Sequence, residues 1–336
     1  MRRTAAAVVV AACALRSVPA CAQPLAPPRA AGAVITDTLW SQALAARKTL
    51  VVYLPPSYQT TPARRYPVAY YLHGATGDET NWTQRGHLAE VMDSLIAGGM
   101  PEMIVAMPDG DAYSYYTTYN LLLDAAGCRR LMLPPGGNAD RDCVAWPHYD
   151  DYIAYDVVRH MDAKYRTQAA RAHRGIAGLS MGGYGAVALA LQYPGTFAAA
   201  ASHSGVLWPL DLAPGAAGGR QLPRNATDSA AFARYRAANA RRYAPVFGTD
   251  SAGWYARDPA TIAARLVARG TGLPALYADC GTEDLFLPQN RAFRDAMRAL
   301  GVPLEYHEWP GAHTWEYWHT HLGDSLRWLA ARITGP

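Results

Sequence analysis

The 336-residue sequence lacks long apolar runs and has little cysteine. No segment holds the roughly 20 consecutive apolar residues that a membrane-spanning helix requires. The five cysteines form neither a C-x-x-C motif nor a cysteine and histidine cluster at zinc-site spacing, so we expect no metal site. A G-x-x-x-x-G-K-[ST] loop, a G-x-G-x-x-G after the first strand and internal repeats are also missing, which argues against nucleotide-binding and solenoid folds.

The excess of positive charge is small and is concentrated at the N-terminus. The formal net charge is +4, but Arg2, Arg3 and Arg16 lie within residues 1–22, which contain no acidic residue. Without that segment, 28 basic side chains stand against 27 acidic ones. A near-neutral chain has no electrostatic footprint for a phosphate backbone, so we expect no nucleic-acid partner.

Residues 1–22 are typical of an export signal. A short basic region precedes the apolar stretch Thr4–Leu15, and Ala20–Ala22 matches the A-x-A cleavage pattern. We therefore predict a secreted or periplasmic protein, in which residues 23–32 form a flexible linker and residues 33–334 one domain. A lipoprotein is the alternative, because the residues before Cys13 and Cys21 resemble lipoboxes.

The remaining three cysteines fall into two groups. Cys128 and Cys143 bracket a loop rich in glycine, proline and charge, and in an exported protein this spacing favours a disulfide. Two unrelated thiols are the alternative. Cys280 ends an apolar run, which indicates a buried thiol.

Strand patterns alternate with helix patterns along most of the chain. Strands are predicted at 33–39, 49–54, 67–72, 103–107, 174–179, 196–201, 274–279 and 304–308, and helices at 87–96, 152–165, 181–192, 289–300 and 315–332. This alternation predicts an α/β fold with a mostly parallel central sheet and helices on both faces. Residues from about 111 to 148 and from 208 to 270 break the pattern, and we expect them to be insertions or a cap region, with helices at 230–242 and 259–268.

The most informative motif is Gly178-Leu179-Ser180-Met181-Gly182, a G-x-S-x-G between a predicted strand and a predicted helix. In that context the serine occupies a tight, strained turn, and the two glycines remove Cβ atoms that would collide there. Ser180 is therefore predicted to be a nucleophile in an α/β-hydrolase fold. A glycine-rich turn with a bystander serine is the alternative interpretation.

A serine hydroxyl needs a base, and the order of the triad in this fold is serine, acid, histidine. His313 follows the last predicted strand and precedes the final helix, as the base should. The loop after the preceding strand contains Glu283 and Asp284, and we favour Asp284 because it lies further along the loop. The acid would fix the tautomer of His313 and stabilise the imidazolium ion.

An acyl-transfer site also needs two N–H donors for the oxyanion. The N–H of Met181, at the start of the helix, is one candidate. The second should come from the loop after an early strand, where His73-Gly74-Ala75 places the N–H of Ala75. His73 itself is interpreted as a structural hydrogen-bonding residue below the site.

Together these motifs resemble the esterase D-like "putative esterase" family of α/β-hydrolases, over about Val51 to Leu329. That family includes feruloyl and acetyl xylan esterases, S-formylglutathione hydrolases, tributyrin esterases and mycolyltransferases. The resemblance implies Ser180, Asp284 and His313 as the triad and Ala75 and Met181 as the oxyanion donors, with no cofactor. The matching segments are Leu72–Gly74 with Trp82, Met107–Gly110, Gly178–Gly183, Gly281–Asp284 and Gly311–Trp315.

The predicted function is hydrolysis of short-chain, acetyl or aromatic esters of sugars or small alcohols. The candidate substrate-binding residues are Trp82, Tyr115, Tyr116 and Trp315. For Tyr115 and Tyr116, an equal alternative is that they are packed tyrosines of a surface loop. An acyltransferase with the same triad is one alternative function. A non-catalytic binding module on a hydrolase scaffold is the other.

Overall fold

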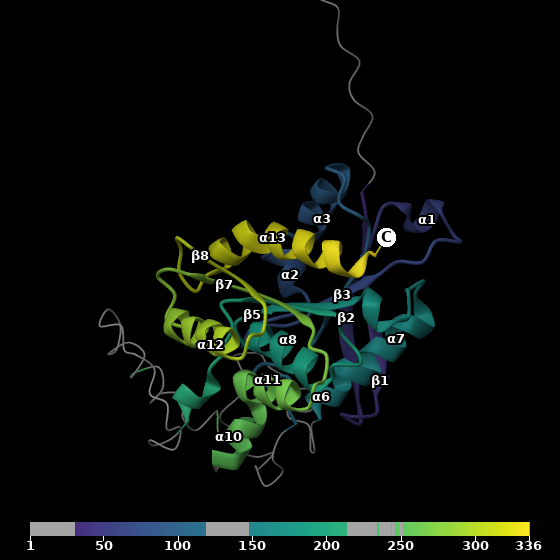
Figure 1. Cartoon of the computed structure of the whole chain (residues 1–336). Helices are drawn as coiled ribbons and strands as arrows, with labels where there is room; N and C mark the ends of the chain where they lie inside the picture. The colour runs from purple at the N-terminus through teal and green to yellow at the C-terminus, as the bar shows by residue number, and fades with distance from the viewer. Residues whose placement is uncertain are drawn as a thin grey trace, which may run out of the picture.

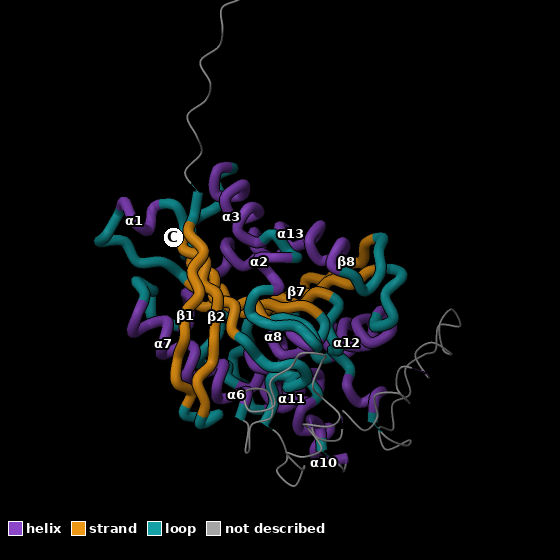
Figure 2. Tube along the Cα trace, turned by 180° about the vertical axis from the view of Figure 1, so that it is seen from behind, coloured by secondary structure: helices purple, strands orange, loops and turns teal. Residues whose placement is uncertain are grey.

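The computed structural model describes residues 31–118, 148–213, 234, 243, 246–248 and 251–335. Its strands are β1 (Ala33–Ser41), β2 (Ala46–Leu54), β3 (Val68–Leu72), β4 (Ile104–Pro108), β5 (Arg174–Leu179), β6 (Ala199–His203), β7 (Ala275–Gly281) and β8 (Leu304–Trp309). They form one sheet in the order β1-β2-β4-β3-β5-β6-β7-β8 (Figure 2). β2 is antiparallel to β1 and β4, whereas the other neighbouring strands are parallel.

Helices cover both faces of this sheet. The α-helices are α1 (Ser57–Thr60), α2 (Asn81–Gln84), α3 (Leu88–Ala97), α6 (Tyr149–Asp151), α7 (Val158–Lys164), α8 (Met181–Gln192), α10 (Ser251–Arg257), α11 (Pro259–Ala268), α12 (Leu287–Ala299) and α13 (Trp315–Ile333). In Figure 1, α2, α3 and α13 lie on one side of the sheet, and α8, α11 and α12 lie on the other.

The apolar core is split by the sheet because successive strand residues point to opposite faces. In β3, Tyr70 and Leu72 pack on the side of α8, whereas Tyr71 packs on the side of α13. All five residues of β3 and all five of β4 are buried. Strands that are apolar on both faces are typical of a parallel sheet with helices packed on each face. The predicted α/β class is therefore confirmed.

Several predicted elements differ from the observed ones by a few residues at their ends, and two of these differences are informative. The predicted strand at 196–201 begins later, because the N–H of Thr196 closes a turn on the carbonyl of Tyr193 and pairing with β7 starts only at Ala199. The predicted helix at 152–165 is a π-helix (Tyr152–Val157) followed by α7.

The predicted helix at 259–268 is observed as α11. Asp258 caps it by accepting a hydrogen bond of 2.8 Å from the N–H of Thr261, and Pro259 occupies the first helical position, where it loses no hydrogen bond. The predicted helix at 230–242, apart from residue 234, and the loop between Cys128 and Cys143 lie outside the described residues. So does the predicted export signal.

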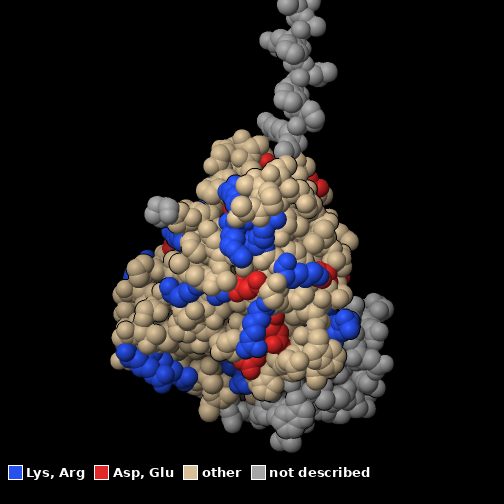
Figure 3. Space-filling view, turned by 90° about the vertical axis from the view of Figure 1, so that its right-hand side faces the viewer, with Lys and Arg blue, Asp and Glu red and all other residues tan. Residues whose placement is uncertain are grey.

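Among the described helices, none has both the length and the apolarity of a membrane span. On the face of the molecule seen in Figure 3, acidic side chains lie between the basic ones. Ion pairs such as Arg64 with Glu102 and Arg174 with Asp162 show the same mixing of charge.

Candidate active site

Three residues separated widely in sequence meet at one edge of the sheet. Ser180 directly follows β5, Asp284 follows β7, and His313 lies between β8 and α13. Strands β5, β6, β7 and β8 are parallel neighbours, so their carboxyl ends lie at the same edge. The fold thus brings together the three residues predicted as a triad.

The three side chains form a continuous chain of hydrogen bonds. Nε2 of His313 lies 2.9 Å from Oγ of Ser180, and Nδ1 of His313 lies 2.8 Å from Oδ2 of Asp284. The other carboxylate oxygen of Asp284 accepts a 2.8 Å bond from the N–H of Phe286. Because the carboxylate accepts from Nδ1–H, Nε2 has the lone pair that can take the proton of Ser180.

The ring of His313 is also held by aromatic contacts. Phe286 meets it edge-on at 5.1 Å between ring centroids, and Trp318 meets it at 4.9 Å with the planes at 89°. The His313 side chain keeps 21% of its surface exposed, whereas that of Asp284 is fully buried. The base is therefore both fixed in direction and open to a substrate.

Glu283, the alternative acid in the sequence, does not join this chain. Its side chain is exposed, and its backbone N–H donates to the carbonyl of Gly311. That bond ties the acid loop to the histidine loop. It leaves Asp284 as the residue that faces His313.

The backbone at Ser180 has the strained geometry predicted for a nucleophile turn, with φ 53° and ψ −115°. A Cβ on Gly178 would lie 2.4 Å from the backbone of Gly182, and a Cβ on Gly182 would lie 2.3 Å from the carbonyl oxygen of Leu72. Any side chain at either position would push the turn away from β3. The N–H of Ser180 donates to the carbonyl of His203, which fixes the turn to β6 as well.

The two predicted oxyanion donors belong to segments next to the nucleophile. Met181 is the first residue of α8, so its N–H has no acceptor within the helix. Ala75 follows Gly74, which packs so closely that a Cβ there would lie 3.5 Å from the Cβ of Ser180. Both segments that carry the candidate donors therefore border the serine.

Three of the four predicted substrate-binding residues prove to be core residues. Trp82 is 1% exposed, and its indole N–H donates to the carbonyl of Leu72, so it anchors α2 to β3. Tyr115 packs among Tyr184, Tyr243 and Phe247, and the hydroxyl of Tyr116 donates to the carbonyl of His73. Their burial gives no support to direct substrate contact by these three residues, and that role stays a prediction.

Trp315 differs from those three residues because it is only partly buried. Its ring meets Trp82 and Trp318 edge-on, and the guanidinium group of Arg85 lies over it. Its predicted role in substrate binding stays a prediction.

Cys280 is a free, fully buried thiol, as predicted. Burial raises the pKa of this thiol well above its usual value, and the nearby carboxylates of Asp284 and Asp279 act in the same direction. A thiol held protonated in this way is a poor nucleophile. Cys280 therefore does not compete with Ser180.

Sequence reasoning missed a buried ion cluster next to the oxyanion loop. Nζ of Lys48 lies 2.8 Å from Oδ2 of Asp109 and 2.5 Å from Oδ1 of Asp111, and the hydroxyl of Tyr149 donates to the same Asp111. The Lys48 side chain has no exposed surface. A charged residue at an inward position of β2 is the signal that could have revealed the cluster.

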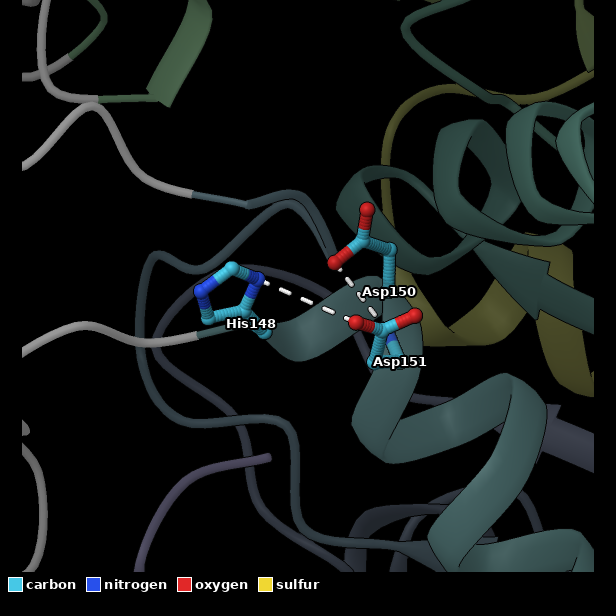
Figure 4. Close-up of side chains that lie close together, drawn as sticks. All are labelled: His148, Asp150 and Asp151. Carbon is cyan, nitrogen blue, oxygen red and sulfur yellow. Dashed lines mark hydrogen bonds and ion pairs between the residues drawn. The ribbon is translucent and has the colours of Figure 1, made fainter. Parts of the chain in front are cut away.

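The described residues include one group of side chains with the spacing of metal ligands, His148, Asp150 and Asp151 (Figure 4). All three are partly exposed. The carboxylate of Asp150 accepts from the hydroxyl of Thr118, and that of Asp151 accepts from Tyr193. Both carboxylates thus have hydrogen-bond partners within the protein.

The comparisons with known proteins agree with this geometry. The family described as "Putative esterase" matches residues 41–329. Esterase Rv1288 of Mycobacterium tuberculosis is 30% identical over 279 residues, which are 78% of this chain and 51% of the relative, so the chain spans about half the length of that relative. The acetyl esterase of Caldicellulosiruptor saccharolyticus is 23% identical over 203 residues, 60% of this chain and 71% of the relative.

Among solved structures, a ferulic acid esterase has a TM-score of 0.65 and 28% identity, and the match covers 91% of this chain and 99% of that one. The family match covers most of the chain, and the sheet order and the Ser180 turn fit it. The chain has an α/β-hydrolase fold and belongs to the "Putative esterase" family.

Proposed function

We propose that the protein is an exported serine carboxylic-ester hydrolase that works through an acyl-enzyme on Ser180. The observation that supports this most strongly is the hydrogen-bonded chain from Ser180 through His313 to Asp284 at the strained turn. Membership of an esterase family adds independent support.

In the proposed mechanism, Oγ of Ser180 attacks the ester carbonyl while Nε2 of His313 takes the hydroxyl proton. The N–H groups of Met181 and Ala75 stabilise the negative charge that develops on the carbonyl oxygen. The bond to the alcohol then breaks, and His313 returns its proton to the leaving alkoxide. Water repeats the sequence on the acyl-enzyme, with His313 first as base and then as acid, and releases the carboxylic acid.

We propose short-chain, acetyl or feruloyl-type esters of sugars or small alcohols as substrates. The similarity to a ferulic acid esterase structure and to an acetyl esterase supports this class. The proposed location outside the cytoplasm is based on the signal-like segment at residues 1–22. An extracellular location suits esters of polymeric sugars, which do not enter cells intact.

Labelling with a fluorophosphonate probe tests the proposal. The parent should be labelled and should hydrolyse p-nitrophenyl acetate, methyl ferulate or an acetylated sugar. Ser180→Ala should lose labelling and at least about 10⁴-fold in kcat, whereas Ser94→Ala, at an exposed serine of α3, should retain both. Equal labelling of Ser180→Ala and the parent would refute the assignment. Adding acceptor alcohols to the same reactions distinguishes hydrolysis from acyl transfer.

A further inference from the structure

The direction of the Ala75 N–H is set by the peptide to which it belongs. That peptide also contains the carbonyl of Gly74, and a trans peptide is planar with its N–H and C=O pointing in opposite directions. Nδ1 of His73 lies 2.8 Å from the carbonyl oxygen of Gly74. The same oxygen also accepts a bond of 3.1 Å from the N–H of Gly77, and the two bonds together fix where the N–H of Ala75 points.

His73 can donate this bond only when Nδ1 carries a proton, and its surroundings select the neutral tautomer in which it does. The N–H of Gly110 donates to Nε2 of His73 at 2.8 Å, so Nε2 must be an acceptor and Nδ1 must carry the proton. Burial lowers the pKa of His73, against the opposing effect of Asp109, whose carboxylate oxygen lies 3.8 Å from Nε2. The neutral ring with Nδ1–H is the form that fits.

The turn that carries Gly110 is held by the buried ion cluster. Lys48 joins Asp109 to Asp111, and the N–H of Asp111 donates to Oδ1 of Asp109 at 3.0 Å. Burial raises the pKa of Asp111 to about 7, and burying the charged pair of Lys48 and Asp109 beside it is costly and contributes little to net stability. In some proteins a cluster of this kind specifies one arrangement of the chain. Here the arrangement that the cluster specifies is the turn that presents Gly110 to His73.

Two further bonds tie the same segments together. The N–H of Thr76 donates to the carbonyl of Ala112 at 2.7 Å, and the hydroxyl of Tyr116 donates to the carbonyl of His73 at 3.0 Å. The peptide before Gly74 and the peptide after Ala75 are therefore both restrained from outside the loop.

We propose that His73 is a positioning residue that aims the N–H of Ala75 at the oxyanion, and that the cluster of Lys48, Asp109 and Asp111 holds His73 through Gly110. This inference rests on the proposed esterase function. It gives residues far from the reacting atoms an effect on kcat.

Two substitutions of His73 separate its two hydrogen bonds. The amide nitrogen of an asparagine can occupy the place of Nδ1 and donate to Gly74, whereas a glutamine reaches the place of Nε2 and keeps only the bond from Gly110. His73→Gln should lower kcat by about 10- to 100-fold with little change in KM. This loss is smaller than the loss in kcat that follows removal of a whole oxyanion donor. His73→Asn should stay within about 5-fold of the parent, since the side-chain donor to the Gly74 carbonyl is preserved.

Tyr116→Phe provides an independent test, because it removes one bond to the loop without changing shape. It should lower kcat about 3- to 10-fold, a smaller effect than loss of a full donor. Tyr53→Phe is the matched control, since that buried tyrosine donates to Asp93, away from the loop. The control should lose stability without a change in kcat.

All variants should reach the same final extent of fluorophosphonate labelling, which shows that Ser180 and His313 remain intact. If the parent neither labels nor hydrolyses esters, the proposed function fails first. If the parent is active and His73→Gln keeps its kcat, or if the glutamine and asparagine variants lose kcat equally, the positioning role is wrong. Should His73→Gln fail to fold, an unchanged kcat in Tyr116→Phe overturns the proposal and a lowered kcat supports it.

Discussion

Oδ2 of Asp284 lies 2.8 Å from Nδ1 of His313, while the adjacent Glu283 has its side chain in solvent. Asp284→Asn should therefore lower kcat for a p-nitrophenyl ester by about 10⁴-fold, because an amide stabilises the wrong tautomer of the histidine and cannot balance its charge. Glu283→Gln is the matched control and should change kcat by less than about twofold, as an exposed substitution. Equal losses in the two variants would mean that the acid has been misassigned.

The close contact between Gly182 and Leu72 predicts that the stability cost of replacing a glycine by alanine depends strongly on its position. Gly182→Ala should lower the free energy of unfolding by about 1–3 kcal/mol and also reduce kcat, because the new Cβ displaces β3 from the nucleophile turn. Gly195→Ala, which meets no atom within 4 Å, should stay within about 0.5 kcal/mol of the parent. Urea unfolding of both variants measures the difference, and similar midpoints would contradict the packing argument.

The buried carboxylate of Asp37 predicts a pH dependence of stability. Burial alone would raise its pKa, but hydrogen bonds from Lys164, His160 and Tyr165 hold the pKa well below the usual value of 3.8. A carboxylate with a depressed pKa contributes stability above its unfolded pKa and loses that contribution as the pH falls.

Asp37→Asn should accordingly be less stable than the parent by about 2 kcal/mol at pH 7. The gap should narrow as the pH falls below 4, since the parent loses its own contribution there. Urea midpoints at pH 7, 5 and 3.5 provide the measurement, with Asp324→Asn at a part-exposed position as the control. A gap that stays constant with pH would show that the charge of Asp37 is not the cause.

Trp82 is expected to affect stability and not substrate affinity. Trp82→Phe removes the indole N–H that donates to Leu72 and should lower the free energy of unfolding by about 1–3 kcal/mol, with KM unchanged. Trp315→Phe is the variant to compare with it, because Trp315 is partly exposed whereas Trp82 is buried. A raised KM in Trp82→Phe at normal stability would contradict this expectation and support the predicted role of Trp82 in substrate binding.

The sequence by itself determined the features that depend on local chemistry. Strand and helix periodicity depends on which side chains can be buried, so β5, α8 and α11 were predicted at their observed bounds. The strained turn at Ser180 requires glycine on both sides, which is why the motif identified the nucleophile. The order of the acid and histidine loops along the chain then followed from the order of the strands.

Only the tertiary structure decided which neighbouring side chains point inward. Asp284 and Glu283 are adjacent in sequence, and the bond from the Glu283 N–H to Gly311 determines which of them faces His313. Tyr116 and Trp82 are aromatic residues of the kind that often bind substrates. They are buried instead, because segments distant in the sequence pack against them. The link from Lys48 to His73 joins a residue of β2 with residues of the loops after β3 and β4. No local pattern encodes it, because its energy comes from contacts between segments that are far apart in the chain.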